Sequence, residues 1–589
     1  MTLDLSKVSD TYFNKLFVSK GAPADNEMKS RVLLLDSYTT SIISMCYSQS
    51  QLLQNDIVLI ELIDNYSFLS TMKHLNCVIY IRPCKNSIRH LVNELRSPHF
   101  GRYSLYFNNT VSKGQLEEIA DADEFELVYQ VLELYQDYFI VNNNLYTTNV
   151  SGYEENAILD ESHGLLSLLL AIKKCPIIKY ESSSIDLKRL SSEIVYYINS
   201  NSNNNLFEDL NKESDIPPLL LLLDRRNDPI TPLITPWTYQ SMIHELIGIE
   251  KNVVNLKDSG EQVILNESQD FFFHDSRYLN YGELTDKFQK YVDKYKSQTQ
   301  QTSADNLKTQ NLSELKKVLT KFPEYKKMLN NILKHLNIIS ELDNKISLQN
   351  LWEISELQQT IVCDLDNHQA IKSKMLEILD NNSISTIHKV KLILLYSYKF
   401  YSNKKEMLLF TSKLKDPSLT QTPPTLSQLS LIKTFGKQFE RLATDFSDSG
   451  GNNIGAIFNS KRINISLLFN SSQNRGTNNV FMQYIPKLNN LLEKIINKGS
   501  TNNNDGEETK LTTLTPDAIT NQYGHDSEQV QDIIIYIKGG VSYEEARLIH
   551  DLTITNPKVN LLIGGDTILN SEQWLNKLYD MNNENTQSV

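Results

Sequence analysis

The stretch RVLLLDSYTTSIISMCYSQSQLLQNDIVLIELI, residues 31–63, contains two short strand-like runs of apolar residues with an amphipathic segment between them. The same alternation continues in CVIYIRP at 77–83 and in YSLYFNN at 103–109. Strand-like runs that alternate with helical segments predict a mostly parallel sheet in the first 140 residues.

One of the intervening segments, residues 86–95, has the spacing of a helix with a single apolar face. The face repeats at i, i+3, i+4 and i+7, and it consists of Ile88, Leu91, Val92 and Leu95. A second α/β unit is predicted to begin near Gly164, and its most apolar strand candidate is LLLLLD at 219–224.

The middle of the chain has a different pattern. From about 246 to 446, stretches rich in lysine, glutamine and leucine predict helices, with few strand candidates. Two isolated strand candidates follow, DIIIYIKGG at 532–540 and VNLLIGG at 559–565. Because two strands do not form a stable domain alone, we expect them to complete the sheet of the second unit, which is then discontinuous in sequence.

Length and composition set broad limits. The chain has 589 residues, which at roughly 150 residues per domain suggests about three or four compact units. Its net charge of −13 provides no positive field for phosphate backbones, so we expect no nucleic-acid partner. The longest apolar runs, 165–172 and 219–223, are too short to span a bilayer, so we expect no membrane insertion.

Cysteine use and the first residues point to the compartment. Five scattered cysteines without a CxxC pair predict neither a disulfide framework nor a zinc site. The first residues, MTLDLSKVSDTYFNKLF, lack the cationic and apolar segments of a secretory signal. We therefore expect a cytoplasmic protein.

Common signatures of catalysis are missing: the sequence contains no GxGxxG, GxxxxGKS/T, GxSxG or HExxH. The turn GGVSYEEA at 539–546 could hold a phosphate, but Ser542 and Glu545 predict a capping box that occupies the free N–H groups. The loop DRRNDPITPLITPW at 224–237 could be a metal or catalytic loop, but its three prolines and Asp228 favour a rigid connector. We therefore expect no catalytic residues, no cofactor and no metal site.

Three polar, asparagine-rich tracts interrupt the pattern at 199–205, 449–453 and 498–528. They contain too few apolar residues to offset chain entropy. We therefore predict loops or disordered insertions there.

Six longer stretches taken together carry a family resemblance. They are LLLDSYTTSIISMCYSQSQLLQNDIVLIELID (33–64), MKHLNCVIYIRP (72–83), ELRSPHFGRYSLYFNN (94–109), GLLSLLLAIKKCPIIKY (164–180), LLLLDRRNDPITPLITPWTYQSMIHELIGI (220–249) and GGVSYEEARLIHDL (539–552). In collinear order they resemble the Sec/Munc (SM) family of SNARE regulators, and within it the branch that serves trans-Golgi and endosomal fusion. The chain departs from the family at Cys84, where relatives often have threonine, and at Lys538, where an apolar residue is common.

The resemblance implies an α/β fold with a large, mainly α-helical insertion, arranged as a three-domain arch of two parallel-sheet α/β domains and one helical domain. We place the N-terminal α/β domain at 1–141 and the discontinuous second α/β domain at 142–246 and 473–589. The helical third domain is then 247–472, with a helical hairpin at about 295–360.

The resemblance also implies a function. The family has no known enzymatic activity, and its members bind syntaxin-type SNAREs and promote assembly of the SNARE helical bundle. We therefore expect a monomer whose partners are a trans-Golgi or endosomal syntaxin-type SNARE, the assembled SNARE complex and, as a further candidate, an R-SNARE. Through these partners it would associate peripherally with Golgi, endosomal or vacuolar membranes. The alternative is an α/β enzyme, a hydrolase or nucleotide-dependent transferase, with an unfamiliar site.

Two surfaces follow from the resemblance. In the family, an exposed groove of the N-terminal domain holds the N-terminal peptide of a syntaxin. The matching residues here are Leu116, Ile119, Ala120, Val128 and Val131. Leu116, Ile119 and Ala120 share one helix face by their i, i+3, i+4 spacing. The alternative is that these residues are ordinary core.

The second surface is an apolar seam with steps of 3 and 4 residues that runs over 312–340. Pro323 interrupts the seam, which favours a bent or unfurled tip. In the family, the segment that matches 321–336 can extend into a platform for SNARE helices. The platform residues are then Pro323, Tyr325, Leu329, Leu333 and Leu336. The alternative is a seam buried inside the helical domain.

Overall fold

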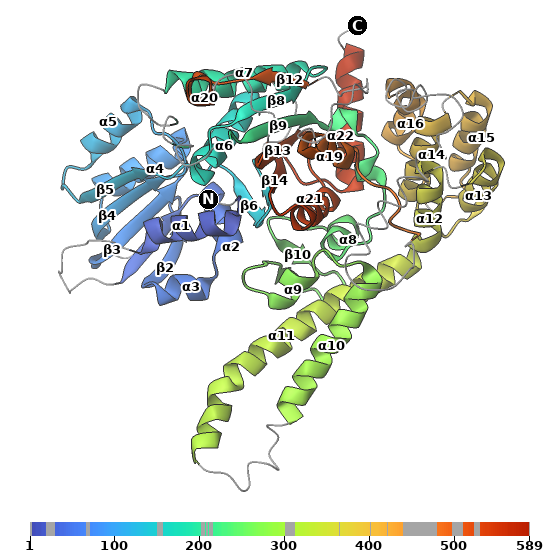
Figure 1. The fold of residues 1–589 in the computed structure, drawn as a ribbon. Coiled ribbons are helices and arrows are strands. Elements are labelled where there is room, and N and C mark those ends of the chain that lie inside the picture. Colours follow the sequence, from blue (N-terminus) through green and yellow to red (C-terminus); the bar gives the residue numbers. More distant parts are fainter. Residues whose placement is uncertain are drawn as a thin grey trace. The chain divides into compact units, whose positions relative to one another are not determined.

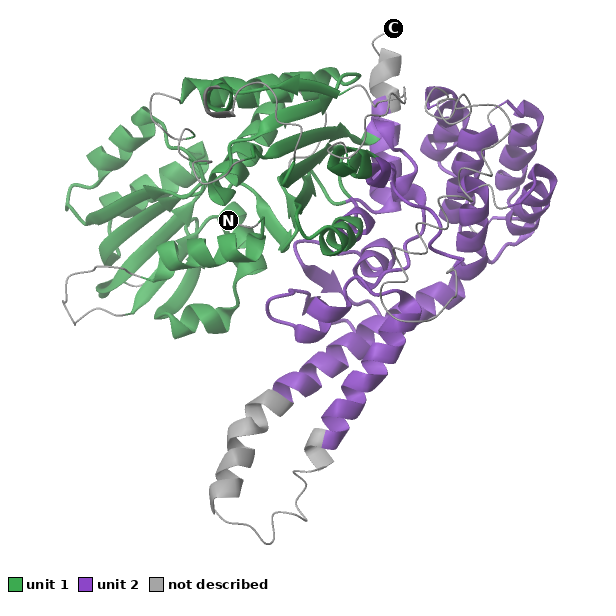
Figure 2. Ribbon diagram, in the orientation of Figure 1, with its two compact units in different colours: residues 1–225, 491–541, 548–568 green, residues 226–490, 542–547, 569–589 purple. Residues whose placement is uncertain are grey.

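The computed structural model describes residues 3–18, 30–65, 71–149, 157–201, 207, 210, 216–300, 312–363, 366–400, 402–420, 422–439, 480–497, 511–523 and 530–587. The chain forms two compact units (Figure 2). Unit 1 comprises Met1–Arg225, Leu491–Val541 and Leu548–Ile568, and unit 2 comprises Arg226–Asn490, Ser542–Arg547 and Leu569–Val589. The division into three domains stays a prediction.

The first sheet of unit 1 has five strands in the order β2-β1-β3-β4-β5, all parallel. Its strands are β1 (Arg31–Leu35), β2 (Ile57–Leu62), β3 (Met72–Ile81), β4 (Phe100–Phe107) and β5 (Val128–Glu133). The helices of this segment are α1 (Leu5–Phe17), α2 (Ser37–Cys46), α3 (Gln49–Gln54), α4 (Lys85–Arg96) and α5 (Lys113–Ala122). The predicted parallel sheet is confirmed.

The core on one side of this sheet joins the strands to α4. All four residues of the predicted apolar helix face are buried there, in one cluster with Val32 and Leu105 of the strands. Parallel strands covered by helices carry nearly continuous apolar runs, and these runs predicted the sheet. The single apolar face of α4 predicted the helix.

The second sheet of unit 1 has seven strands in the order β12-β8-β9-β13-β14-β7-β6. They are β6 (Phe139–Asn142), β7 (Leu145–Thr147), β8 (Ile177–Glu181), β9 (Leu219–Asp224), β12 (Leu511–Leu514), β13 (Asp532–Lys538) and β14 (Asn560–Gly565). Among the neighbouring helices are α6 (Ala157–Ile172), α7 (Ile185–Ser200), α19 (Lys487–Asn497), α20 (Asp517–Tyr523) and α21 (Tyr543–Thr555). Strand β13 pairs in parallel with both β9 and β14, so the predicted return of the late strands to the second sheet is confirmed.

The prediction of a loop or disordered insertion at 498–528 is wrong for residues 511–523. Strand β12 pairs antiparallel with β8, and α20 follows it directly. The run LTTL of β12 has β-branched threonines, which suit a pleated strand, and β8 supplies the partner that the polar composition concealed. Residues 449–453, the second tract, lie outside the described residues.

Unit 2 is mainly helical, as predicted for the middle of the chain. Its helices are α8 (Tyr239–Leu246), α9 (Phe271–Ser276), α10 (Tyr281–Gln300), α11 (Leu312–Leu348), α12 (Leu351–Val362), α13 (His368–Asp380), α14 (Thr386–Phe400), α15 (Lys404–Leu414), α16 (Leu426–Gln438) and α22 (Ser571–Gln587). A small antiparallel pair, β10 (Val253–Asn255) and β11 (Gln262–Ile264), precedes α9. Within this unit, α10 and α11 run side by side (Figure 1). The helical hairpin at about 295–360 stays a prediction.

No helix in the described ranges combines the length and the apolar character needed to cross a bilayer.

The loop after β9 is the predicted rigid connector. It forms two short 3₁₀ turns, Arg225–Asn227 and Thr231–Leu233. The Asp228 carboxylate accepts a hydrogen bond from the backbone N–H of Thr231 at 3.2 Å. The carbonyl oxygen of Pro229 accepts one from the indole N–H of Trp574 at 3.0 Å. These contacts tie the connector to unit 2 and give its polar residues a structural role.

A buried ion pair lies at the end of β13. The Nζ atom of Lys538 is 2.7 Å from Oε1 of Glu161 on α6, and both side chains have almost no exposed surface. Burial raises the pKa of Glu161 to about 7, although Lys538 acts in the opposite direction. The family commonly has an apolar residue at the position of Lys538. Here the lysine forms an ion pair with a carboxylate on α6, far away in the sequence.

We expect Lys538→Met to lower the free energy of unfolding of unit 1 by about 3 to 5 kcal/mol at pH 8, because it leaves a buried carboxylate without its cation. The loss should be smaller at pH 5.5. Without Lys538 the pKa of Glu161 rises further, so the carboxyl group is protonated there and carries no charge to bury. Urea unfolding at the two pH values measures the difference.

The wild type sets the sign of the pH effect. The folded-state pKa of Glu161 lies above its ordinary value, so its contribution to stability is present at low pH and is lost as the pH rises through about 7. The control is Lys7→Met, whose side chain is 65% exposed and should cost less than about 1 kcal/mol. Equal losses for Lys538→Met at both pH values would contradict the assignment.

Candidate partner-binding surfaces

The first predicted surface lies on α5. A capping box fixes the start of this helix: the Ser112 hydroxyl accepts from the Gln115 N–H, and the Gln115 side chain accepts from the Ser112 N–H at 3.0 Å. This start points Leu116, 39% exposed, and Ala120 outward. Ile119 points inward and belongs to the core cluster shared with α4. Only two of the three helix residues are thus available to a partner.

The neighbouring strand β5 is an edge of the five-stranded sheet. Val131 is 42% exposed, whereas Val128 is partly buried against the same core as Ile119. The Asp123 carboxylate holds the turn between α5 and β5, because it accepts from the backbone N–H groups of Leu127 and Val128 at 2.9 and 3.0 Å. The edge strand therefore extends the apolar surface of α5 in a fixed position.

Three further apolar side chains on this segment are exposed and were not singled out from the sequence. They are Phe125, Tyr129 and Leu132. The guanidinium of Arg102 lies over the ring of Tyr129, 4.0 Å from its centroid, which is close enough for a cation–π contact. All three lie within residues 125–132 of the sequence. This concentration of large apolar residues could have indicated the exposed surface before the structure was known.

The second predicted surface lies on α11. Leu329, Leu333 and Leu336 are 36%, 48% and 47% exposed, and their i, i+4, i+7 spacing places them in one row along the helix. Ile332 and His335 on other sides of the helix are buried. The three leucines are therefore an outward row, and the alternative of a fully buried seam does not apply to them.

The remaining platform residues, Pro323 and Tyr325, have side chains outside the described part of the chain. The bounds of α11, Leu312–Leu348, place both residues within one helix. Lys326 is exposed beside the row of leucines, whereas the exposed Lys327 lies on the opposite side of the helix.

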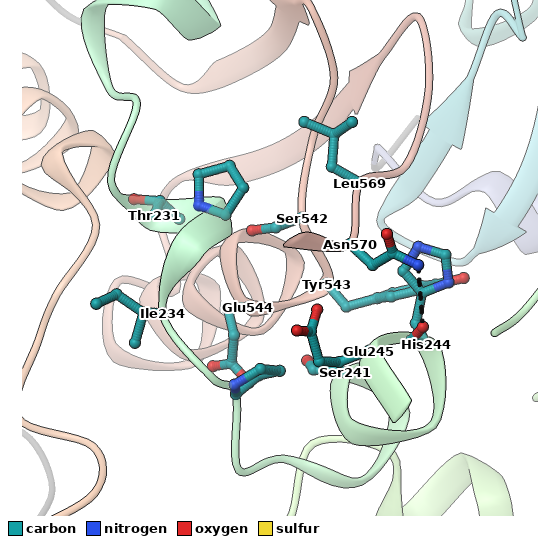
Figure 3. Close-up of a pocket in the computed structure, with 12 residues that line it drawn as sticks. Thr231, Ile234, Ser241, His244, Glu245, Ser542, Tyr543, Glu544, Leu569 and Asn570 are labelled. Atoms are coloured by element: carbon teal, nitrogen blue, oxygen red, sulfur yellow. Dashed lines mark hydrogen bonds between the residues drawn. The ribbon is translucent and has the colours of Figure 1, made fainter. Parts of the chain in front are cut away.

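A small cavity in unit 2 lies between the connector, α8 and the start of α21 (Figure 3). Its volume of about 30 Å³ suits a single water molecule rather than a substrate. Glu245 in its wall is bound by Lys391 at 2.9 Å and by the Ser571 N–H at 2.9 Å. Burial opposes the charge of Glu245, but these partners hold its pKa below the ordinary value. This carboxylate has a structural role.

A larger cavity, of about 480 Å³, lies in unit 1 beyond the carboxyl ends of β3 and β4. The guanidinium of Arg82 in its wall is 3.7 Å from a carboxylate oxygen of both Asp137 and Asp160. The guanidinium of Arg82 is thus already held between two carboxylates of the chain itself. Across the described ranges, no group of three or more His, Cys, Asp or Glu side chains could hold a metal ion.

The first turn of the five-stranded sheet is also closed to phosphate. In doubly wound sheets, this turn usually provides the N–H groups that bind phosphate. Here the Asp36 carboxylate accepts from the N–H of Thr39 at 2.7 Å, the N–H of Arg82 at 2.7 Å and the hydroxyl of Ser87 at 2.8 Å. The Asp36 carboxylate therefore occupies the Thr39 N–H of this turn and joins it to the segments that follow β3.

The fold and the two apolar surfaces define a binding protein built on α/β sheets with a helical insertion. A model of the Sec1 family matches residues 31–577, and the chain belongs to this family. The resemblance to SM proteins is thereby confirmed.

Particular relatives are similar along almost the whole chain. The chain is 35% identical to vacuolar protein sorting-associated protein 45 of Saccharomyces cerevisiae, with 98% of this chain and 99% of the yeast protein aligned. It is 31% identical to the human protein of that name, with 96% and 95% aligned.

Solved structures of SM proteins are also similar to this chain along almost its whole length. The SM protein Vps45 in complex with the Qa SNARE Tlg2 matches with a TM-score of 0.81 and 30% identity, over 98% of both chains. Sly1p in complex with an N-terminal peptide of Sed5p has a TM-score of 0.77 at 16% identity, over 99% of both chains, and shares the fold.

The difference in burial between Leu116 and Ile119 on α5 can be tested directly. We expect Leu116→Asp to change the free energy of unfolding by less than about 0.5 kcal/mol, because an exposed side chain loses little packing. Ile119→Asp should cost more than about 3 kcal/mol, because it buries a carboxylate in the core. Thermal unfolding of the two variants measures this contrast. Similar melting temperatures for both would contradict the burial described for this helix.

Proposed function

We propose that this protein binds a syntaxin-type (Qa) SNARE and promotes assembly of SNARE complexes in trans-Golgi, endosomal or vacuolar fusion. It acts by binding, without catalysis or a cofactor, and it associates with these membranes peripherally from the cytoplasm. The observation that carries the proposal is the full-length likeness to Vps45, whose solved structure contains the Qa SNARE Tlg2.

The surface of α5 and β5 is the proposed site for the N-terminal peptide of the SNARE. Leu116, Ala120 and Val131 provide exposed contacts, while Ile119 and Val128 lie beneath them and support the surface. An apolar peptide side chain placed against the exposed residues would bury surface on both partners.

We expect Leu116→Arg to weaken binding of a fluorescently labelled Qa-SNARE N-terminal peptide by at least about tenfold, because one buried apolar side chain contributes ~1.5 to 3 kcal/mol. The control is Glu118→Arg, an exposed position on the opposite side of α5, which should keep the affinity within about twofold. Fluorescence anisotropy measures both. An unchanged affinity for Leu116→Arg, with a native circular dichroism spectrum, would refute this peptide site.

The outward row of α11 is the proposed platform for SNARE helices. Leu329, Leu333 and Leu336 repeat with the spacing that amphipathic helices use against one another. Lys326 borders the row and would favour a partner helix with an acidic flank. Pro323 and Tyr325 belong to the same proposal through the family pattern.

We expect Leu333→Arg to slow SNARE-complex assembly in a reconstituted liposome-fusion assay by about tenfold or more, without changing N-terminal peptide affinity. Its matched control is Asn330→Arg, which is also exposed on α11 but lies to one side of the row of leucines. If both variants stimulate fusion as the wild type does, the row is not a platform.

A further inference from the structure

Within unit 2, polar contacts join the second half of α11 to residues 246–261, which precede α10. The side chain of Asn344 donates to Asp258 at 3.0 Å, and that of Asn337 donates to Glu261 at 3.3 Å. Lys345 donates to the backbone carbonyl of Leu246 at 2.8 Å. The first two contacts are exposed, so each contributes little to holding the helix.

One cluster differs because it is buried. The ring of His335 has no exposed surface, its Nδ1 is 2.8 Å from the Tyr239 hydroxyl, and its Nε2 is 2.9 Å from Oδ2 of Asp270. The ring of Phe272 packs against it, with centroids 4.6 Å apart. Lys334, the neighbouring residue of α11, also pairs with Asp270.

The charges of the cluster assign its protons. Burial lowers the pKa of His335, so the imidazole is neutral at neutral pH. Burial opposes the charge of Asp270, but His335 and Lys334 outweigh it and lower its pKa, so the carboxylate is ionised and can only accept. Nε2–H of His335 therefore donates to Asp270, and the Tyr239 hydroxyl donates to Nδ1. The three side chains form one directed chain of hydrogen bonds.

Asp270 also determines where α9 begins. Its Oδ1 accepts from the N–H of Phe273 at 3.1 Å as the N-cap of that helix. The same carboxylate thus joins the start of α9 to α11, and Tyr239 adds α8 through His335. Three elements of unit 2 meet at this one buried group.

The cluster sets the rotation of α11 about its axis. Successive residues of an α-helix are about 100° apart, so His335 lies between Leu333 and Leu336 in sequence but faces away from their row. A rotation of the helix by one residue would expose His335 and bury a leucine in its place. A leucine side chain has no hydrogen-bond donor, so the buried Asp270 carboxylate would lose its partner.

We propose that Asp270, His335 and Tyr239 are positioning residues that hold α11 so that Leu329, Leu333 and Leu336 face a partner helix. The proposal rests on the platform function proposed above. The three residues do not touch the partner; they act through the orientation of the helix that does.

The test uses Asp270→Asn in the full-length protein, since asparagine keeps the shape and the N-cap but removes the charge. We expect amide hydrogen exchange over 326–340 to become at least about tenfold faster and stimulation of SNARE assembly to fall at least about fivefold. N-terminal peptide affinity should stay within about twofold, which a general loss of folding would not allow. The matched control is Asp258→Asn, which contacts the same helix through exposed Asn344 and should leave all three measurements unchanged.

Tyr239→Phe is the second variant, because it removes only the hydroxyl and keeps the buried ring; it should change exchange and assembly in the same direction by a smaller factor. Unchanged exchange over 326–340 in both variants would overturn the proposal. Faster exchange with undiminished SNARE assembly would support the positioning of α11 but overturn the platform function, so the two failures are distinguishable.

Discussion

The pairing of β9 with β13 is the interaction on which the rest of the molecule depends. Ile533 pairs with Leu219 and Lys538 with Asp224, so two segments about 310 residues apart form the centre of one sheet. Every residue of both strands is buried. The entropic cost of closing such a long loop grows only slowly with its length, so a buried central strand can hold an insertion of this size in place.

Polar groups at the ends of buried strands also have structural roles in both sheets. A central strand must end somewhere, and at that point its backbone and side chains need partners. The Lys538–Glu161 pair meets that need at the end of β13, and Asp36 meets it at the end of β1 in the other sheet. At these strand ends the polar groups of the protein are bound to one another.

The sequence predicted the parts of the fold whose signals are local. The apolar runs of β9 and β13, the face of α4 and the capping box at Ser542 depend on neighbouring residues, and the structure contains them. The strand β12 was missed because its stability comes from β8, more than 300 residues earlier.

The candidate surfaces show the same limit. Spacing alone placed Leu116 and Ile119 on one helix face, but only the packing of α4 decides that Ile119 is core. The cluster of Asp270 with His335 was invisible for the same reason, because the two residues are 65 positions apart and neither belongs to a recognisable motif.

The position of β12 has a consequence for the solubility of the protein. It covers β8, which would otherwise be an edge of the seven-stranded sheet with unpaired N–H and C=O groups. Uncovered edges of this kind template pairing between molecules. Strand β12 becomes the edge in place of β8, but it has only four residues, two of them threonines, and short edge strands pair less readily between molecules. A shortened chain that lacks β12 would instead expose the longer, more apolar β8 and would be more prone to aggregate.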